Sequence, residues 1–236
     1  MSRTIATIEA RMTSSRLPGK VMLDVLGRPL LELLVERLQQ SSALDGICLA
    51  TTDRPTDDGL EELARRMGIL CFRGSEDDVL MRVLGAAEFA QAEVIVEITA
   101  DCPLMDPAVI DRVVDNYRNS KRDYVSNTLQ RTYPDGLDVQ VFATDVLRRV
   151  AALTDNPRDR EHVSCYIYEH PDMFTLANVA SGLPERFWNI RLTVDYRHDF
   201  ERIRAIFEAL YPGNPVFSLA EICGHLDRNP SLIVAQ

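Results

Sequence analysis

Lysine, cysteine pairs and long apolar runs are scarce or absent in this sequence of 236 residues. Acidic residues outnumber basic ones by 36 to 26, which gives a net charge of −10. This balance argues against a protein that binds nucleic acid or a membrane surface, because such proteins present a basic face. No apolar run approaches the roughly 20 residues of a membrane helix. Only Lys20 and Lys121 are lysines, and every other basic residue is an arginine.

The five cysteines are widely spaced, and no two of them form a C-x-x-C pair. This spacing gives no support to a zinc knuckle or a redox dithiol, so free thiols are expected. The first residues also lack the basic and apolar segments of a secretory signal. A reducing, cytoplasmic location is therefore expected.

The first 120 residues alternate between strand-like and helix-like segments. Strands are expected at residues 4–9, 46–51, 69–72 and 94–99. Helices are expected at residues 29–40, 57–67 and 75–91, the last with Ser75 as N-cap and Asp78 completing a capping box. This alternation predicts an α/β fold in three layers, in which helices cover both faces of a mostly parallel sheet.

The order of strand-like and helix-like segments changes in the second half. We expect this half to form a small antiparallel elaboration of the same sheet. Strands are expected at residues 123–128, 137–142, 174–179 and 189–194, and helices at 144–153, 158–169, 198–210 and 219–226. Because the sequence has no internal repeat and no low-complexity linker, we interpret residues 1–236 as a single domain. Its parts are a first half (1–120), the elaboration (121–190), and a return strand, helix and tail (191–236).

The loop at residues 11–20 carries three cations and three hydroxyl groups directly after the first strand. Ligands of open α/β sheets bind beyond the carboxyl ends of the strands, and this mixture of groups suits phosphates. Pro18 and Gly19 would bend the chain tightly before Lys20. The segment matches neither the P-loop nor G-x-G-x-x-G. We predict phosphate binding; the alternative is a solvated loop whose arginines pair with surface acids.

Asp101 follows the strongest predicted strand, at residues 94–99, and is a candidate magnesium ligand. Mg²⁺ is usually held by one or two carboxylates together with substrate phosphates. Asp195, at the end of the strand expected at 189–194, is the candidate for the second carboxylate. The alternative for Asp101 is a turn cap. Asp106, which precedes Pro107, is expected only to cap a helix.

These segments together resemble a known family. Residues 8–20 read Ile-Glu-Ala-Arg-Met-Thr-Ser-Ser-Arg-Leu-Pro-Gly-Lys, which is similar to the R-x-x-S-[ST]-R-L-P-x-K signature of CTP-dependent cytidylyltransferases that activate acidic sugars. That family includes the CMP-KDO and acylneuraminate cytidylyltransferases. The closer match is its spore-coat polysaccharide biosynthesis protein F (SpsF-like) branch. Further motifs of that branch are matched at residues 50–53, 72–80, 99–104, 123–127, 133–139, 160–162 and 192–195. The resemblance extends to about residue 210.

The resemblance implies a nucleotide-diphospho-sugar transferase (GT-A-like) fold, with residues 1–120 as its nucleotide-binding half. It also implies CTP as substrate and Mg²⁺ as cofactor. The groups implied to bind the triphosphate are Arg11, Ser14, Ser15, Arg16 and Lys20. The implied nucleotide contacts also include Glu9, Ala10, Thr52, Asp53, Arg73 and Ser75. Asp101 and Asp195 would hold the metal, and the catalytic set would be Arg11, Arg16, Lys20 and Asp101.

The implied reaction transfers CMP to an acidic sugar or phosphorylated acceptor and releases pyrophosphate, in surface polysaccharide or glycan biosynthesis. Residues 121–190 would cover this anionic acceptor and contribute to a homodimer. Asp138, Arg160 and His162 are the candidate acceptor contacts; a solvent-facing Asp138 and a structural His162 are the alternatives.

Three positions depart from the family pattern. Glu9 replaces a usual Gln, Thr13 a common Gly and Met81 a common Asp.

The main alternative is a nucleotide-sugar-dependent glycosyltransferase of GT-A-like fold, which would normally carry a D-x-D motif that Asp101-Cys-Pro does not supply. A binding or scaffold protein with a degenerate site is disfavoured because the loop cations and both carboxylates are present.

Overall fold

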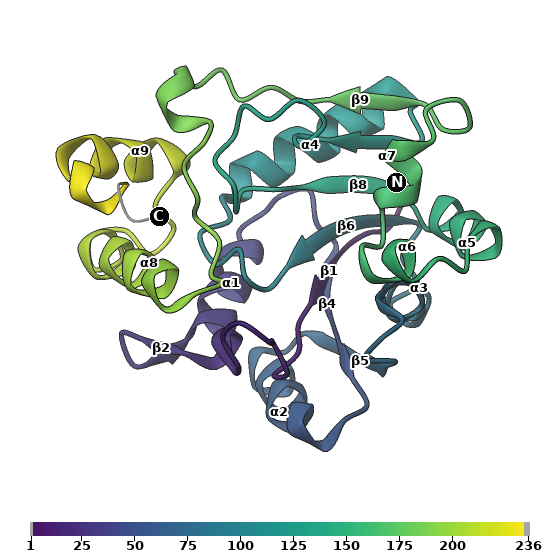
Figure 1. Cartoon of the computed structure of the whole chain (residues 1–236), viewed down its shortest axis with the longest axis horizontal. Coiled ribbons are helices and arrows are strands. Elements are labelled where there is room, and N and C mark those ends of the chain that lie inside the picture. Colours follow the sequence, from purple (N-terminus) through teal and green to yellow (C-terminus); the bar gives the residue numbers. More distant parts are fainter. Residues whose placement is uncertain (1, 234–236) are drawn as a thin grey trace.

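A seven-stranded sheet, in the order β5-β4-β1-β6-β8-β7-β9, forms the centre of a computed structural model that describes residues 2–233 (Figure 1). The strands are β1 (Thr4–Glu9), β4 (Gly46–Thr52), β5 (Leu70–Gly74), β6 (Val94–Thr99), β7 (Tyr124–Ser126), β8 (Gln140–Ala143) and β9 (Leu176–Asn178). The four strands from β5 to β6 are parallel, and β8 runs antiparallel to both of its neighbours. The predicted α/β class with a mostly parallel sheet is confirmed.

Helices cover both faces of the sheet, so the molecule has three layers. They are α1 (Leu30–Leu38), α2 (Asp58–Met67), α3 (Val79–Phe89), α4 (Pro107–Ser120), α5 (Thr144–Leu153), α6 (Pro157–Glu161), α7 (Cys165–Glu169), α8 (Arg197–Leu210) and α9 (Leu219–Arg228). One buried cluster joins α1, α2, α4, α8 and α9 to the sheet, and the other joins α3, α5 and α7 to its opposite face. No helix within residues 2–233 is both long and apolar enough to cross a membrane.

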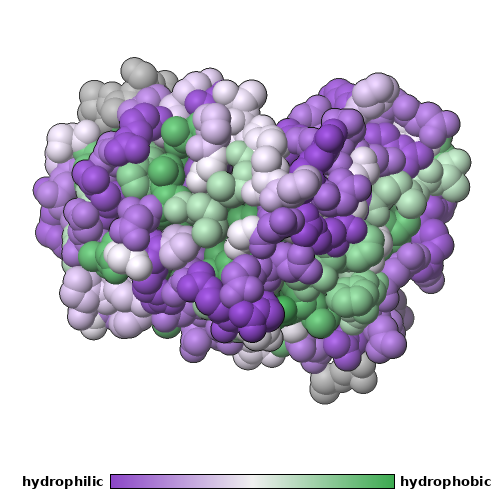
Figure 2. Space-filling model, turned by 90° about the horizontal axis from the view of Figure 1, so that it is seen from below, coloured by the Kyte–Doolittle hydropathy of each residue, from purple (hydrophilic) through white to green (hydrophobic). Residues whose placement is uncertain are grey.

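The remaining elements are short. A hairpin of β2 (Asp24–Val25) and β3 (Arg28–Pro29), which the sequence did not predict, follows the first loop. Short 3₁₀ turns occur at Lys20–Met22, Pro55–Asp57, Glu185–Phe187 and Pro230–Leu232. On the face seen in Figure 2, hydrophilic side chains predominate and apolar ones gather in separate patches.

Local patterns explain the elements that were predicted with correct bounds, namely β1, β6 and α5. In β1 and β6 nearly every side chain is buried, because both faces of a parallel sheet are covered. Alternate residues point to opposite faces, so Val96 joins one buried cluster and Ile95 the other. Glu97 therefore shares the face of Ile95, towards α3 and α5.

Two predicted helices exist but with wrong bounds. Helix α3 begins at Val79 rather than Ser75, because Asp78 is its N-cap and accepts from the backbone N–H of Met81 at 3.0 Å. The helix expected at 158–169 is interrupted between α6 and α7. There Val163, fully buried against the α3 side of the sheet, has a positive φ of 34°, which ends the helical path.

The prediction of a strand at 189–194 was also wrong. This segment forms only an isolated bridge between Asp135 and Arg191, so no return strand enters the sheet. It lies against a tight turn at Gly136, where φ is 104° and an added Cβ would come within 2.7 Å of the backbone of Leu192. The close approach carries Asp195 to the edge of the sheet beside Asp101, whose carbonyl accepts the N–H of Val194 at 2.9 Å.

Candidate functional site

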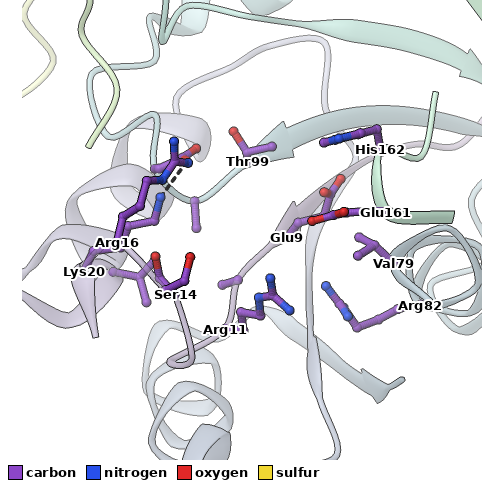
Figure 3. Close-up of a pocket in the computed structure, with 15 residues that line it drawn as sticks. Glu9, Arg11, Ser14, Arg16, Lys20, Val79, Arg82, Thr99, Glu161 and His162 are labelled. Atoms are coloured by element: carbon purple, nitrogen blue, oxygen red, sulfur yellow. Dashed lines mark hydrogen bonds and ion pairs between the residues drawn. The ribbon is translucent and has the colours of Figure 1, made fainter. Parts of the chain in front are cut away.

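A cavity of about 340 Å³ lies at the carboxyl ends of β1 and β6. Its wall contains Glu9, Ala10, Arg11, Ser14, Ser15, Arg16, Lys20, Val21, Val79, Arg82, Thr99, Ala100, Asp101, Glu161 and His162. Figure 3 shows Ser14, Arg16 and Lys20 on one side of this cavity and Val79, Arg82 and His162 on the other. We call it the first cavity. It occupies the edge of the sheet at which α/β folds bind ligands.

The loop at residues 11–20 folds back on itself at the mouth of the first cavity. The N–H of Gly19 donates to the carbonyl of Met12 at 2.9 Å, and the N–H of Lys20 donates to that of Leu17 at 3.1 Å. Gly19 has a φ of 70°, a left-handed conformation that glycine adopts without strain. This turn directs the Lys20 side chain inward, where it is only 12% exposed.

Asp57 anchors the same loop to the sheet, a role that the sequence analysis missed. Its Oδ1 accepts from the N–H of Met12 at 2.9 Å, and its Oδ2 accepts from the hydroxyls of Thr51 at 3.0 Å and Thr52 at 2.6 Å. The side chain is fully buried. Burial alone would raise the pKa of Asp57, but the hydrogen bonds from Thr52, Met12 and Thr51 outweigh it and lower the pKa.

Asp57→Asn is expected to lower the free energy of unfolding at pH 7 by about 2–4 kcal/mol, because the amide NH₂ must face groups that are themselves donors. The native pKa of Asp57 is below its unfolded value, so its contribution is present above the unfolded pKa and is lost as pH falls through the native one. Urea unfolding at pH 7 and at about pH 3 measures both effects. Asp58→Asn is the control, since Asp58 is 66% exposed. Equal losses at both pH values would contradict the prediction.

Lys20, Asp101 and Asp195 form a cluster at one end of the first cavity. The Lys20 Nζ donates to Asp101 Oδ2 at 2.7 Å and to Asp195 Oδ1 at 3.0 Å. Arg16 Nη2 lies 2.7 Å from the same Asp195 oxygen, and Arg191 binds the other one. Two carboxylates distant in the sequence thus meet around one ammonium group.

The cluster has the donor set that Mg²⁺ accepts. Both carboxylate oxygens lie within 3.0 Å of one nitrogen, so a single hydrated ion could reach both of them. No three His, Cys, Asp or Glu side chains within residues 2–233 form a metal-binding group, so phosphates would have to complete the coordination. Burial would raise the pKa of Asp101, but the charge and hydrogen bond of Lys20 lower it, which keeps the carboxylate ionised.

Four of the residues predicted to contact the nucleotide do not line the first cavity. Thr52 is buried against Asp57, and Asp53 is exposed, with its N–H bonded to the carbonyl of Gly74. Arg73 donates to the carbonyls of Thr52 and Arg54 and pairs with Asp58 and Glu61. Ser75 accepts from the N–H of Asp78. The side chains of Thr52, Arg73 and Ser75 instead make contacts within the loops that flank the cavity.

The three predicted acceptor contacts are not brought together. Arg131 holds Asp138 with two hydrogen bonds of 2.8 Å. Arg160 pairs with Asp78 at 3.4 Å and with Asp155 at 3.0 Å. His162 alone of the three lines the first cavity.

Arg82 also lines the first cavity and was not singled out from the sequence. It is 3% exposed and donates to the carbonyls of Ala50, Ser75 and Glu76. The sequence did contain a signal for this buried arginine. Arg82 stands three residues after Val79 and just before Val83, on the buried stripe of an apolar helix. A charged residue in such a stripe needs partners, and its position marks a site.

Glu9 and Glu97 form a second group of carboxyls on adjacent strands. Strand pairing places Glu97 opposite Thr7 and Glu9 opposite Thr99, so the two glutamates lie diagonally on the same face. Burial raises the pKa of Glu97 to about 8. Burial, and then the charge of Glu97, raise the pKa of Glu9, while Arg82 opposes them.

Glu97→Gln is expected to change how stability depends on pH. The native pKa of Glu97 is raised, so its contribution is present below the unfolded value of about 4.5 and is lost as pH rises through about 8. The variant's free energy of unfolding, relative to wild type, should therefore rise by about 2–4 kcal/mol from pH 5 to pH 9. Urea unfolding across this range tests it, with the exposed Glu93→Gln as control. A difference that is constant with pH would count against a buried, protonated Glu97.

Comparison with known proteins identifies the family of the chain. The model of the cytidylyltransferase family matches residues 5–217. SpsF of Bacillus subtilis, named as a spore coat polysaccharide biosynthesis protein, is 35% identical over 98% of this chain and 96% of its own length. A 3-deoxy-manno-octulosonate cytidylyltransferase of Idiomarina loihiensis is 33% identical over 52% of this chain and 48% of its own.

A solved structure of similar sequence supports the same assignment. The cytidylyltransferase of Leptospira borgpetersenii superposes with a TM-score of 0.92, over 100% of this chain and 98% of that one, at 31% identity. The family resemblance inferred from the motifs is therefore confirmed. The chain belongs to the cytidylyltransferase family of nucleotidyltransferases.

Proposed function

We propose that this enzyme transfers CMP from CTP to a small-molecule acceptor and releases pyrophosphate, in the biosynthesis of a surface polysaccharide or glycan. The observation that carries the proposal is the convergence of the 11–20 loop with two carboxylates at one end of the first cavity. Guanidinium, ammonium and hydroxyl groups there suit a triphosphate, and the acidic groups suit a magnesium ion.

In this reaction an acceptor oxygen attacks the α-phosphorus of CTP, the bond between that phosphorus and the bridging oxygen breaks, and pyrophosphate leaves. Arg11, Ser14 and Ser15 bind the phosphates, while Arg16 and Lys20 stabilise charge on the departing pyrophosphate. A carboxylate or phosphate acceptor is already ionised, so no general base is assigned. The protein contributes mainly positioning and charge neutralisation.

Asp101 and Asp195 would hold Mg²⁺ in this proposal. When bound, the ion would neutralise phosphate charge and orient the reacting groups. Lys20, which bridges the two carboxylates, would move to the phosphates of CTP. The homodimer and the cytoplasmic location expected from the sequence stay part of the proposal.

The test is to incubate the purified protein with each NTP, Mg²⁺ and a panel of sugar acids, sugar phosphates and polyol phosphates, and to measure pyrophosphate. We expect release with CTP and one class of acceptor, and little with other nucleotides. Consumption of a nucleotide-sugar donor, without pyrophosphate release from CTP, would replace this proposal with the glycosyltransferase alternative.

A further inference from the structure

A second cavity, also of about 340 Å³, adjoins the first one. Its wall contains Glu9, Glu97, Thr99, Gln140, Arg158, Glu161, His162, Ser164 and Tyr168. Glu9, Thr99, Glu161 and His162 line both cavities, so the two meet at the carboxyl ends of β1 and β6. A molecule in the second cavity would therefore adjoin a nucleotide in the first.

The walls of the second cavity are acidic. Three glutamates line it, and Arg158 is the one Arg or Lys in the described wall. That guanidinium is held by Glu169 through two hydrogen bonds of 2.8 and 2.6 Å. Burial raises the pKa of Glu9 and the charge of Arg82 opposes this rise, but the Arg82 guanidinium donates to backbone carbonyls. The carboxyls thus lack a hydrogen-bonded cation of their own among the described residues.

Glu97 is 4% exposed, and its Oε2 has no hydrogen-bond partner within residues 2–233. The Oε1 of Glu9, which is also buried, has none there either. A buried carboxyl oxygen without a donor is costly, and native proteins keep such groups mainly where a ligand supplies the donor. Both glutamates line the cavity, so the missing donors point to its occupant.

We propose that the second cavity binds the acceptor, and that the acceptor carries a primary ammonium group held by Glu97 and Glu9. This inference rests on the proposed function. The acceptor is then a zwitterion, with a carboxylate or phosphate towards Lys20 and the nucleotide, and an amino group towards Glu97 and Glu9.

An ammonium group fits better than the other donors. A hydroxyl is neutral and donates one hydrogen bond, so it could satisfy only one of the two oxygens and would not favour ionisation of the buried carboxyls. A compact ammonium has three donors and one positive charge, which matches two orphaned oxygens in a confined space. A divalent metal would need further ligands, and no group of three candidate side chains exists in the described part of the chain.

The experiment compares matched pairs of probes that differ only in an amino or a hydroxyl group. Suitable pairs are glucosamine 6-phosphate with glucose 6-phosphate, and galactosamine 1-phosphate with galactose 1-phosphate. Calorimetry gives Kd for each probe with Mg²⁺ and a CTP analogue that has a methylene bridge between its α and β phosphates. We expect the amino member of at least one pair to bind about 10-fold more tightly or better.

Variants of the full chain identify the group responsible. Glu97→Gln keeps the shape of the side chain and should reduce the preference for the amino member to about 2-fold or less. Glu93→Gln removes an exposed carboxylate just before the same strand and should retain the preference. A Glu97→Gln protein with the wild-type preference would refute the role of Glu97.

Two outcomes separate this inference from the function on which it rests. If the CTP analogue binds but no amino probe binds more tightly than its hydroxyl partner, the ammonium inference is wrong and the cytidylyltransferase proposal stands. If neither CTP nor its analogue binds, and no acceptor yields pyrophosphate, the proposed function itself is wrong.

Discussion

Asp101→Asn is expected to lower kcat/KM for CTP-dependent pyrophosphate release by about 10³-fold or more. The Asp101 carboxylate faces the Lys20 ammonium at 2.7 Å and is kept ionised by it. In the proposed reaction it would be a ligand of Mg²⁺, and an amide oxygen without charge binds that ion far less well. Steady-state pyrophosphate assays at saturating acceptor measure the loss.

A magnesium titration separates loss of a metal ligand from loss of a partner for Lys20. Asp101→Asn should need a much higher Mg²⁺ concentration for half-maximal rate, while its affinity for CTP without metal should change little. Asp115→Asn is the matched control, because Asp115 is 68% exposed and lies on α4. An unchanged magnesium requirement in the Asp101 variant would remove Asp101 from the metal site.

Lys20→Arg is expected to lower kcat by about 10²-fold, although it conserves charge. Lys20 is 12% exposed, and its single nitrogen bridges Asp101 and Asp195. A planar guanidinium is larger and spreads its donors over a fork, so it cannot occupy the same point between the carboxylates. Single-turnover kinetics with CTP and acceptor measure the chemical step directly.

The second lysine of the chain provides the control. Lys121 lies exposed at the end of α4, away from both cavities, so Lys121→Arg should retain activity within about 2-fold. Each variant makes the same chemical change at one of the two lysines. Near-wild-type turnover by Lys20→Arg would show that any cation serves at that position and would end the argument for a compact ammonium.

The sequence was sufficient for several elements whose deciding pattern is local. Strands β1 and β6 were predicted with correct bounds, because short runs rich in β-branched residues bury both faces of a parallel sheet. Asp106 was correctly predicted to cap α4, where it accepts from the N–H of Ala108 at 2.9 Å. The family, too, was readable, since its motifs are short and ordered along the chain.

Local patterns failed where a distant part of the chain decides the backbone. The helix expected at 158–169 breaks at Val163, because the Val163 side chain is buried against the face of the sheet that α3 covers. The segment at 189–194 alternates like a strand, yet it is pinned across the Gly136 turn and forms a single bridge. In both cases packing against residues remote in sequence outweighs the local preference.

The amino-acid sequence by itself determined strands β1 and β6, the group of cations and hydroxyls at residues 11–20 and the supply of carboxylates. Only the tertiary structure decided which of these groups meet. Lys20 and Asp195 are 175 positions apart, and Glu9 and Glu97 come together through the pairing of β1 with β6. Periodicity and composition are properties of neighbours along the chain, whereas the order and register of strands arise from burying the whole sheet at once.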